Sequence, residues 1–220
     1  YWCDARSKAA DAVRDAGMVP AATSRIGGFV ALTGTGFPPT AMQRWAESVA
    51  LDAAPTIAVI EDVTGSGKTE AAIVLAHRLM QAGIAHGLHA LPWREPRPGA
   101  QVLRAGLFYL HNQAEAGSAC PLTMTHAGIA VLRRQGEPGE AWLPGLLSLD
   151  YDPRPLPVAG KRGLTLGMAL TEKQGGSDLR ANSTRAFAVG ARGPGQAYEL
   201  LGHKWFCSAP MSDGFLTLAQ

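Results

Sequence analysis

The sequence predicts an α+β fold, in which a strand–loop–helix unit is followed first by helices and then by strands. Residues 56–76 read TIAVIEDVTGSGKTEAAIVLA: a short apolar run with β-branched residues, a glycine-rich loop and an amphipathic helix. Residues 100–134 repeat apolar side chains at helical spacing, whereas the apolar period becomes two from Leu164 onward. The sequence pattern changes near residues 87–92, and this change separates the first unit from the rest of the chain.

The elements of the first unit are bounded by glycine and proline. Residues 2–17 alternate Ala and Val with charged residues at helical spacing, and Gly17 ends that run. Residues 27–39 are rich in Gly and Pro, which is typical of a loop. We therefore expect helices over residues 2–17, 41–50 and 68–81, the last closed by Gly83, and a strand over residues 56–61.

The second part changes from helix to strand. Residues 100–116 and 123–134 are predicted helices, separated by Gly117 and Pro121. Five prolines lie within residues 136–163, which we therefore expect to be mostly loop. Antiparallel strands are predicted over residues 164–170, 184–189, 198–201 and 215–218, with ARGPGQ as a hairpin turn.

Composition and charge narrow the class of protein. The 220 residues include 46% apolar and 17% charged residues, which is typical of a globular protein with a sizeable core. A net charge of +2 gives no sequence-wide positive field for nucleic acid. No apolar run is long enough to cross a bilayer and no secretory leader opens the chain, so we expect a cytoplasmic protein. Because it begins at Tyr1 and stops directly after a predicted strand, we also expect a fragment.

The cysteines and the basic residues show no metal site or disulfide framework. Cys3, Cys120 and Cys207 have neither zinc spacing nor a pairing pattern, so we expect free thiols, with Cys120 and Cys207 buried. The six histidines show no pair with zinc spacing either. Three arginines are compatible with a phosphate or CoA contact, although a solvated loop face is the favoured interpretation: Arg94, Arg97 and Arg104.

The run DVTGSGKT, residues 62–69, has the composition of a phosphate-binding loop. Its glycines let successive backbone N–H groups surround anionic oxygens, Lys68 would meet the terminal phosphates, and the Thr69 hydroxyl would bind Mg²⁺. Asp62 departs from the usual pattern, which begins with Gly or Ala. The alternative is an ordinary glycine-rich turn. The predicted ligand is ATP with Mg²⁺, with these contacts: Thr64, Gly65, Ser66, Gly67, Lys68 and Thr69.

Residues 1–88, most specifically residues 39–88, resemble the helicase part of the CRISPR-associated helicase–nuclease of type I interference systems. The words that carry the resemblance are PTAMQRWAESVAL and IEDVTGSGKTEAAIVLAHRLMQAGIAHGL. It implies a RecA-like domain that drives DNA unwinding with ATP, and it places Gln43 where an adenine-reading glutamine is expected. No acidic Mg²⁺-binding motif follows downstream. We therefore expect a partial RecA-like unit that binds a nucleotide weakly and does not unwind DNA.

A second motif, ALTEKQGGSDLRA, occupies residues 169–181. A strand that ends at Thr171 would present a hydroxyl and backbone amides to a planar ring, and Gly175 and Gly176 allow a tight turn that places Ser177 near a phosphate or the ring edge. GHKWFCSAP follows and offers aromatic walls and the hydroxyl of Ser208. The alternative is a hairpin sheet with an ordinary Gly-Gly-Ser turn and two core aromatic residues.

Residues 89–220 resemble the acyl-CoA dehydrogenase family, in its adaptive-response branch of flavoproteins made during alkylation stress. HALPWREPRPGAQVLRAGLFYLHNQAEAGSACPLTMTHAGIAVL, YDPRPLP and KRGLTLGMALTEKQGGSD carry the resemblance. It implies FAD, an acyl-CoA or related substrate, a homo-oligomer and DNA as a partner, the last shared with the helicase family. The catalytic glutamate of the family lies beyond these residues, and Glu172 is not that base. The implied FAD contacts are Met168, Leu170, Thr171, Gly176, Ser177, Phe206 and Ser208.

The boundary between the two resemblances falls at residues 90–92, an Ala-Leu-Pro sequence that both families share. A crossover there would join two reading frames. The predicted domains are residues 1–88, a partial RecA-like α/β segment, and residues 89–220, helices and the start of a β-domain of acyl-CoA dehydrogenase type. We expect an FAD-dependent acyl-CoA dehydrogenase-like oxidoreductase fragment of the alkylation-response type. The alternatives are an ATP-dependent DNA helicase fragment and a non-functional chimeric product. A crossover predicts that the two parts share no packed core.

Overall fold

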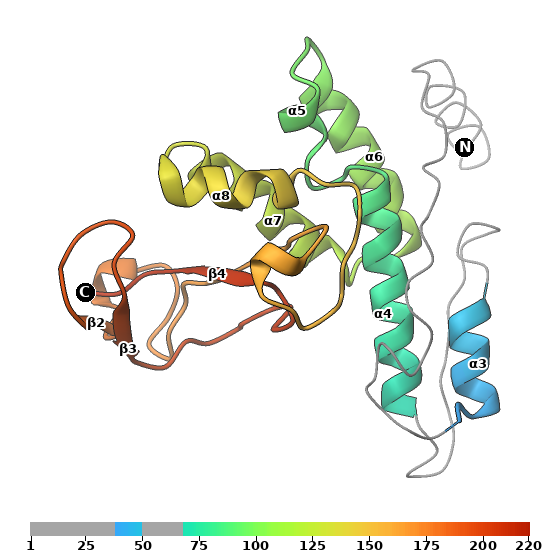
Figure 1. The fold of residues 1–220 in the computed structure, drawn as a ribbon. Helices are drawn as coiled ribbons and strands as arrows, with labels where there is room; N and C mark the ends of the chain where they lie inside the picture. Colours follow the sequence, from blue (N-terminus) through green and yellow to red (C-terminus); the bar gives the residue numbers. More distant parts are fainter. Residues whose placement is uncertain (1–37, 50–67) are drawn as a thin grey trace.

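A computed structural model describes residues 38–49 and 68–220 of the chain, and Figure 1 shows their arrangement. The predictions of a helix over residues 2–17, a strand over residues 56–61 and a phosphate loop before Lys68 lie outside these residues. The helices are α3 (Ala41–Ser48), α4 (Lys68–Ala85), α5 (Leu91–Arg94), α6 (Ala100–Ala114), α7 (Ala119–Leu132) and α8 (Glu137–Leu146). The strands are β1 (Leu166–Ala169), β2 (Arg185–Ala188), β3 (Tyr198–Leu201) and β4 (Gly214–Thr217), with short 3₁₀ turns at Val158–Gly160 and Leu179–Ala181.

Helix α3 begins with a capping box and lies beside α4 (Figure 1). The Thr40 hydroxyl accepts from the Gln43 backbone N–H at 3.3 Å, and the Gln43 side-chain oxygen accepts from the Thr40 backbone N–H at 2.8 Å. Ala46 packs against Ala71 and Val74, the three being 0% exposed. Small side chains at this contact allow the two helices to approach closely.

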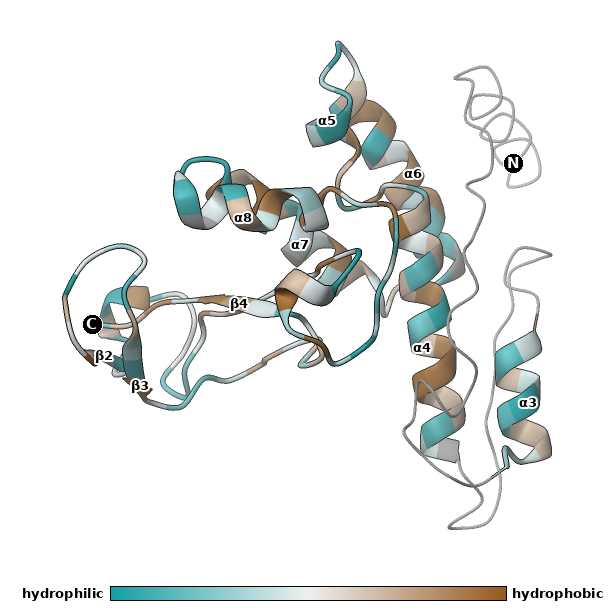
Figure 2. Ribbon diagram, viewed as in Figure 1, coloured by the Kyte–Doolittle hydropathy of each residue, from teal (hydrophilic) through white to brown (hydrophobic). Residues whose placement is uncertain are grey.

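Helix α4 covers the predicted residues 68–81 and continues to Ala85. Apolar and polar stretches alternate along it (Figure 2), as a helix with buried and exposed sides requires. Met80 and Ile84, in its C-terminal half, join three buried side chains from later in the chain to form one apolar cluster: Leu88, Leu122 and Tyr151. His77 Nδ1 and the Tyr151 hydroxyl lie 2.6 Å apart. The expectation that residues 1–88 and 89–220 share no packed core is therefore wrong, whereas the domain boundary itself stays a prediction.

A second buried cluster joins α7 and α8 to β1, and contains Ala90, Ile129, Leu146, Leu164 and Leu166. The loop expected over residues 136–163 is wrong at its start, because α8 occupies Glu137–Leu146. Proline is compatible with the first turn of a helix, where its missing N–H has no helical partner. Pro144 lies inside the helix, and Leu146, two residues later, is part of the buried cluster.

Helix α7 begins at Ala119, four residues before the predicted start. The prediction that Pro121 separates two helices is wrong, because it falls within the first turn of α7, where proline is tolerated. Between α4 and α6 the chain forms the one-turn helix α5, with Pro92 in its first turn. His89, just before it, is 1% exposed, and its Nε2 donates to the Ser148 carbonyl at 3.0 Å.

The strands form two separate two-stranded sheets. β2 pairs with β3 in the predicted antiparallel hairpin, with Arg185 opposite Leu201. β1 pairs with β4 in parallel, with Leu166 opposite Gly214, so the expectation of an entirely antiparallel segment is wrong. The chain between β1 and β4 is long enough for the crossover that a parallel pair requires. The structure thus confirms a fold of mixed helix and sheet, while a RecA-like unit is not shown within the described residues.

Two further predictions concern single side chains and the membrane. Cys120 and Cys207 are exposed free thiols, so their expected burial is wrong, and Cys3 lies outside the described residues. Cys120 lies in the first turn of α7, and Cys207 follows the exposed Phe206, so neither position faces a core. Among the described helices, none is both long and apolar enough to cross a membrane.

Candidate functional site

The C-terminal end of β1 is fixed by α7 on one side and by β4 on the other. The Thr125 hydroxyl accepts from the Leu166 backbone N–H at 3.1 Å and donates to the Pro121 carbonyl at 3.0 Å. The Thr217 hydroxyl of β4 donates to the Ala169 carbonyl at 2.7 Å. Directly after this end comes the predicted cofactor-binding turn, residues 170–177.

Glycines shape this turn. The backbone of Glu172 pairs with that of Gly175, whose N–H donates to the Glu172 carbonyl at 3.0 Å. Gly175 has φ +142°, which disfavours any residue with a Cβ. A Cβ on Gly176 would lie 2.7 Å from Thr171 Oγ1 and would push that side chain away. The two glycines therefore allow the Thr171 hydroxyl to remain where the turn begins.

The Glu172 carboxylate is buried and ties three chain segments together. It accepts from the Ser183 N–H (2.6 Å) and hydroxyl (2.7 Å) and from the Thr184 N–H (2.9 Å) and hydroxyl (2.6 Å). Lys204 Nζ donates to the same carboxylate at 2.9 Å. The Ser183 backbone N–H, followed by the Thr184 hydroxyl, holds the pKa of Glu172 well below its usual range. Five donors therefore occupy this carboxylate, and they favour its ionised form.

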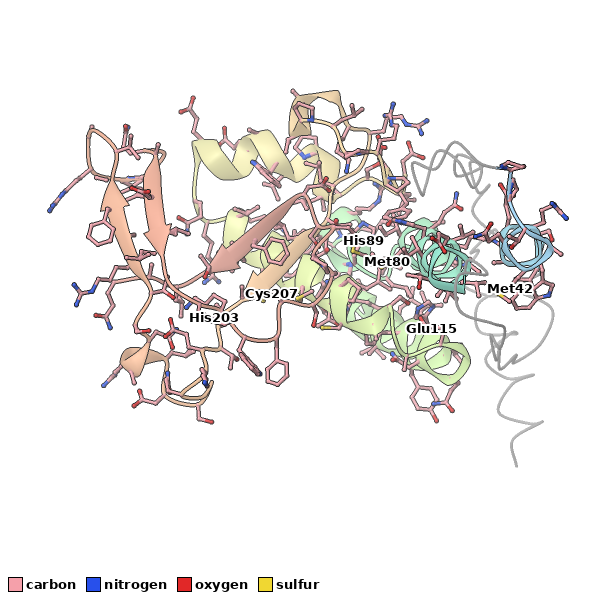
Figure 3. The ribbon with its side chains drawn as sticks, turned by 90° about the horizontal axis from the view of Figure 1, so that it is seen from below. Met42, Met80, His89, Glu115, His203 and Cys207 are labelled. Atoms are coloured by element: carbon pink, nitrogen blue, oxygen red, sulfur yellow. The ribbon has the colours of Figure 1, made fainter. Side chains whose placement is uncertain are left out.

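The second predicted segment, residues 204–208, lies beside the turn. The Trp205 backbone N–H donates to the Thr171 carbonyl at 2.9 Å, and Lys204 and Glu172 pair through their backbones. Phe206 follows with φ +61°, a conformation that is rare for an aromatic residue, and its side chain is 77% exposed. Trp205 and Phe206 meet edge to face, with ring centroids 6.1 Å apart. In Figure 3, His203, which precedes this segment, and Cys207, which belongs to it, lie between the hairpin of β2 and β3 and the helices.

The structure therefore brings together two of the predicted cofactor-binding segments. Across the described residues, no hydrogen bond engages the hydroxyls of Thr171, Ser177 and Ser208, so all three can bind a ligand. Leu170 and Met168 are half-buried, and the Leu170 carbonyl accepts from Asn182 at 2.9 Å. Free hydroxyls, an exposed aromatic ring and a turn that leaves no room for a Cβ on Gly176 fit a flat, polar-edged cofactor such as FAD.

The residues predicted to bind a nucleotide are only partly described. Thr64, Gly65, Ser66 and Gly67 lie outside the described residues, and Lys68 begins α4. Thr69 is exposed in the first turn of that helix. Gln43 is 5% exposed and completes the capping box of α3. Its role as an adenine-reading residue, and Mg²⁺ binding by Thr69, stay predictions.

The three arginines considered for a phosphate contact each interact with another residue of the chain. Arg104 Nε donates to the Leu88 carbonyl at 2.7 Å, and its guanidinium lies 5.0 Å from the centre of the Phe108 ring. Arg94 donates to the Leu147 carbonyl at 2.5 Å. Arg97 lies 3.7 Å from Glu95 in an exposed pair. Arg104 is therefore part of the packing between α6 and the chain before α5, and is not part of a solvated loop face.

Sequence reasoning missed the residues that hold the site together. Besides Glu172 and Lys204, a nearly buried ion pair joins Lys161 to Asp213, and Asp213 Oδ2 accepts from the Thr165 backbone N–H at 2.8 Å. For Glu172 and Lys204, the available signal was an acidic residue in TEKQ and a basic residue in GHKW, two motifs that were already assigned to one site. An open cavity of about 460 Å³ also adjoins the turn. Its lining shares none of the predicted FAD contacts: Glu172, Lys173, Gln174, Ser183 and His203.

Known proteins that resemble this chain are of the acyl-CoA dehydrogenase type that the second motif predicts. Residues 76–153 match the family model described as the adaptive response protein AidB N-terminal domain. The chain is 50% identical over 146 residues to the putative acyl-CoA dehydrogenase AidB of Escherichia coli (strain K12), covering 66% of this chain and 26% of that protein.

Two solved structures are similar in fold and sequence. The structure described as Bd2924 apo-form aligns with a TM-score of 0.57 and 28% identity, over 81% of this chain and 34% of the other. Caenorhabditis elegans ACDH-11 in complex with C11-CoA aligns with a TM-score of 0.52 and 28% identity, over 66% and 24%. None of these matches supports the helicase resemblance of residues 1–88. The chain is similar to acyl-CoA dehydrogenases of the AidB type and spans about a quarter of the length of that curated relative.

Proposed function

We propose that this chain supplies the flavin-binding turn of an FAD-dependent acyl-CoA dehydrogenase-like oxidoreductase of the alkylation-response type. The observation that carries the proposal is the 2.9 Å bond from the Trp205 N–H to the Thr171 carbonyl. It joins the end of β1 to the aromatic segment, so that residues far apart in sequence border one site. The similarity to AidB and to ACDH-11 supports the same assignment.

Within this proposal the residues bind and orient the cofactor. The hydroxyls of Thr171, Ser177 and Ser208 donate to polar atoms of FAD, and the exposed Phe206 ring covers one side of its flat ring system. Leu170 and Met168 lie against the ring system, and Gly176 keeps the approach to Thr171 open. When bound, the flavin supplies the hydride acceptor for oxidation of an acyl chain.

Proton abstraction is not assigned to the described carboxylates of this site. A general base needs a pKa near the working pH and an unoccupied oxygen that reaches its proton. Glu172 has neither property, because five donors occupy it and its pKa is lowered. Asp213 is tied to Lys161 and Thr165, and Asp152 is tied to Arg154. We therefore assign binding and orientation, and no catalytic base, to these residues.

The proposed substrate is an acyl-CoA or a related acyl compound. Its support is the similarity to ACDH-11, whose structure is described as a complex with C11-CoA. A homo-oligomer and DNA binding rest on the family resemblance alone, and ATP binding rests on a loop outside the described residues. The geometry of the described residues favours flavin binding over each of them.

Titration with FAD tests the proposal. The purified chain should quench FAD fluorescence with saturation, and Phe206→Ala should weaken the affinity by about tenfold, because one aromatic contact is worth roughly 1 kcal/mol beyond its buried area. Phe187→Ala is the matched control, since it removes another exposed phenyl ring (48%) from β2. Equal affinities for the wild type and both variants, or no quenching by the wild type, would contradict the proposal.

A further inference from the structure

Glu172 and Lys204 form an ion pair in an unusual place for a structural salt bridge. The two side chains are only 3% and 11% exposed, although the surrounding strands bury few side chains. Burial of two charges is costly, and it is retained only where geometry and additional hydrogen bonds compensate. Four hydroxyl and N–H donors from Ser183 and Thr184 provide that compensation on the carboxylate.

The pair joins segments that are distant in sequence but adjacent at the site. Glu172 follows the proposed FAD contact Thr171 directly, and Lys204 precedes Phe206 by two residues. Their ion pair spans 32 residues, and the bonds to residues 183 and 184 span 11 and 12. One carboxylate thus sets the separation between the hydroxyl-bearing turn and the aromatic segment.

The conformation of Phe206 shows why this separation must be fixed. A non-glycine residue with φ +61° persists only where its surroundings over-determine it. The Phe206 ring is too exposed for packing to provide that restraint. The restraint comes from its neighbours: Lys204 is held by Glu172, the Trp205 N–H by Thr171, and the Ser208 N–H by the Phe206 carbonyl at 3.1 Å.

We propose that Glu172 is a positioning residue for the flavin site and that Lys204 is its counter-charge: together they hold the Phe206 segment at a fixed distance from Thr171. Neither side chain touches the cofactor, and both act through their neighbours in sequence. This inference rests on the proposed function for its ligand, but the positioning itself exists in the chain without FAD.

The test uses the full chain and four variants. Glu172→Gln replaces an acceptor by an N–H₂ group that faces the donors of Ser183 or Thr184, and Lys204→Met removes the ammonium group at similar length. Lys204→Arg keeps the charge. Asp152→Asn is the matched control, because it makes the same carboxylate-to-amide change at another buried acid, which pairs with Arg154.

Two measurements are made on each variant: FAD affinity by titration and hydrogen exchange of the Trp205 backbone amide without FAD. Glu172→Gln and Lys204→Met should weaken FAD affinity by roughly tenfold, the size expected for a lost hydrogen bond to a charged group, and should speed Trp205 exchange. Lys204→Arg and Asp152→Asn should each keep the FAD affinity and the Trp205 exchange rate of the wild type. Urea midpoints show whether each variant is folded.

The outcomes separate this inference from the proposed function. If the wild type binds no FAD, the proposed function fails, and faster Trp205 exchange in Lys204→Met still supports the positioning of the two segments. If Trp205 exchange is unchanged in both Glu172→Gln and Lys204→Met, the inference is overturned whether or not FAD binds. An equal loss of affinity in Asp152→Asn would also overturn it, because the effect would then be general destabilisation. Should Glu172→Gln fail to fold, Lys204→Met against Lys204→Arg decides alone.

Discussion

The helices and the C-terminal strands of this chain bury different kinds of side chain. In the helical part, Leu122, Ile129 and Leu146 are 0% exposed and lie at the centres of apolar clusters. Of the described residues after Ala169, the buried ones are polar: Glu172, Asn182 and Thr184. Apolar packing is strong but has no direction, whereas hydrogen bonds fix atoms at set distances and angles. The difference suggests that the helices provide stability and that the strand part provides geometry.

The largest expected effect is a cavity in the helical part. Leu122→Ala should lower the free energy of unfolding by about 4 kcal/mol, because this side chain of α7 is fully buried against α4. Urea unfolding followed by circular dichroism measures it. Val102→Ala, at a 76% exposed position on α6, is the control and should change stability by less than about 0.5 kcal/mol. Similar losses in both variants would mean that the cluster around Leu122 does not carry the stability.

The next effect should come from the buried ion pair between Lys161, ahead of β1, and Asp213, directly before β4. Asp213→Ala leaves the Lys161 ammonium buried without its partner and removes the acceptor of the Thr165 N–H. We expect a loss of roughly 3 kcal/mol. The double variant Lys161→Met/Asp213→Leu should recover most of it, because no buried charge remains. A double variant as unstable as Asp213→Ala would show that the pair matters for more than charge compensation.

A pH effect distinguishes the two parts of the chain. Burial lowers the pKa of His89 to about 4, so between that value and the usual value of about 6.5 the unfolded chain binds a proton that the folded chain does not. His89 therefore contributes stability that is fully present above pH 6.5 and is lost as pH falls toward 4, by roughly 2 to 3 kcal/mol. The lowered pKa of Glu172 acts in the strand part only below its ordinary value near 4.5.

Urea midpoints of the wild type and His89→Gln, measured from pH 7 to pH 4.5, test this assignment. The glutamine keeps a donor for the Ser148 carbonyl but does not titrate. As pH falls, the wild type should lose more stability than His89→Gln, so the free energy of unfolding of the wild type should fall relative to that of the variant. A difference that is constant over this range would show that His89 does not titrate with folding.

The smallest effect is expected on the outer side of the hairpin formed by β2 and β3. Phe187 and Leu200 are 48% and 53% exposed, so Phe187→Ala and Leu200→Ala should each change the free energy of unfolding by no more than about 0.5 kcal/mol. Thermal unfolding of both variants measures this. A loss above 2 kcal/mol in either one would remove the contrast between an apolar helical part and a polar strand part.

Helices and hairpins that depend on neighbouring residues could be predicted from the sequence. Strand pairing between distant residues could not. Helix α4 and the β2–β3 hairpin follow from periodicity and turn residues that lie within each element. The parallel pairing of β1 with β4 depends on two short runs more than 40 residues apart, and no local pattern specifies their relative direction. Helix α8 forms where a loop is predicted, because proline in the first turn of a helix does not interrupt it.

The candidate site shows the same limit. Thr171, Gly176 and Ser177 could be selected from one short motif, whereas the place of Glu172 depends on donors from residues 183, 184 and 204. A sequence gives the order of these groups but not the register that brings them to one carboxylate. The buried side chains of Lys161 and Asp213 could not be recognised either, because charged residues are ordinarily exposed.

Helix α4 sets the angle between α3 and the later helices, because it packs against both. Val74 faces α3, while Met80 and Ile84 face the later helices, and one uninterrupted helix carries both sets. Each residue of an α-helix turns it by about 100° and advances it by about 1.5 Å. A single residue inserted between Leu75 and His77 would therefore swing α3 around the helical part by about a quarter turn, whereas an insertion of four would return it to nearly the same side. The angular phase of α4 thus fixes where α3 lies relative to the helical part.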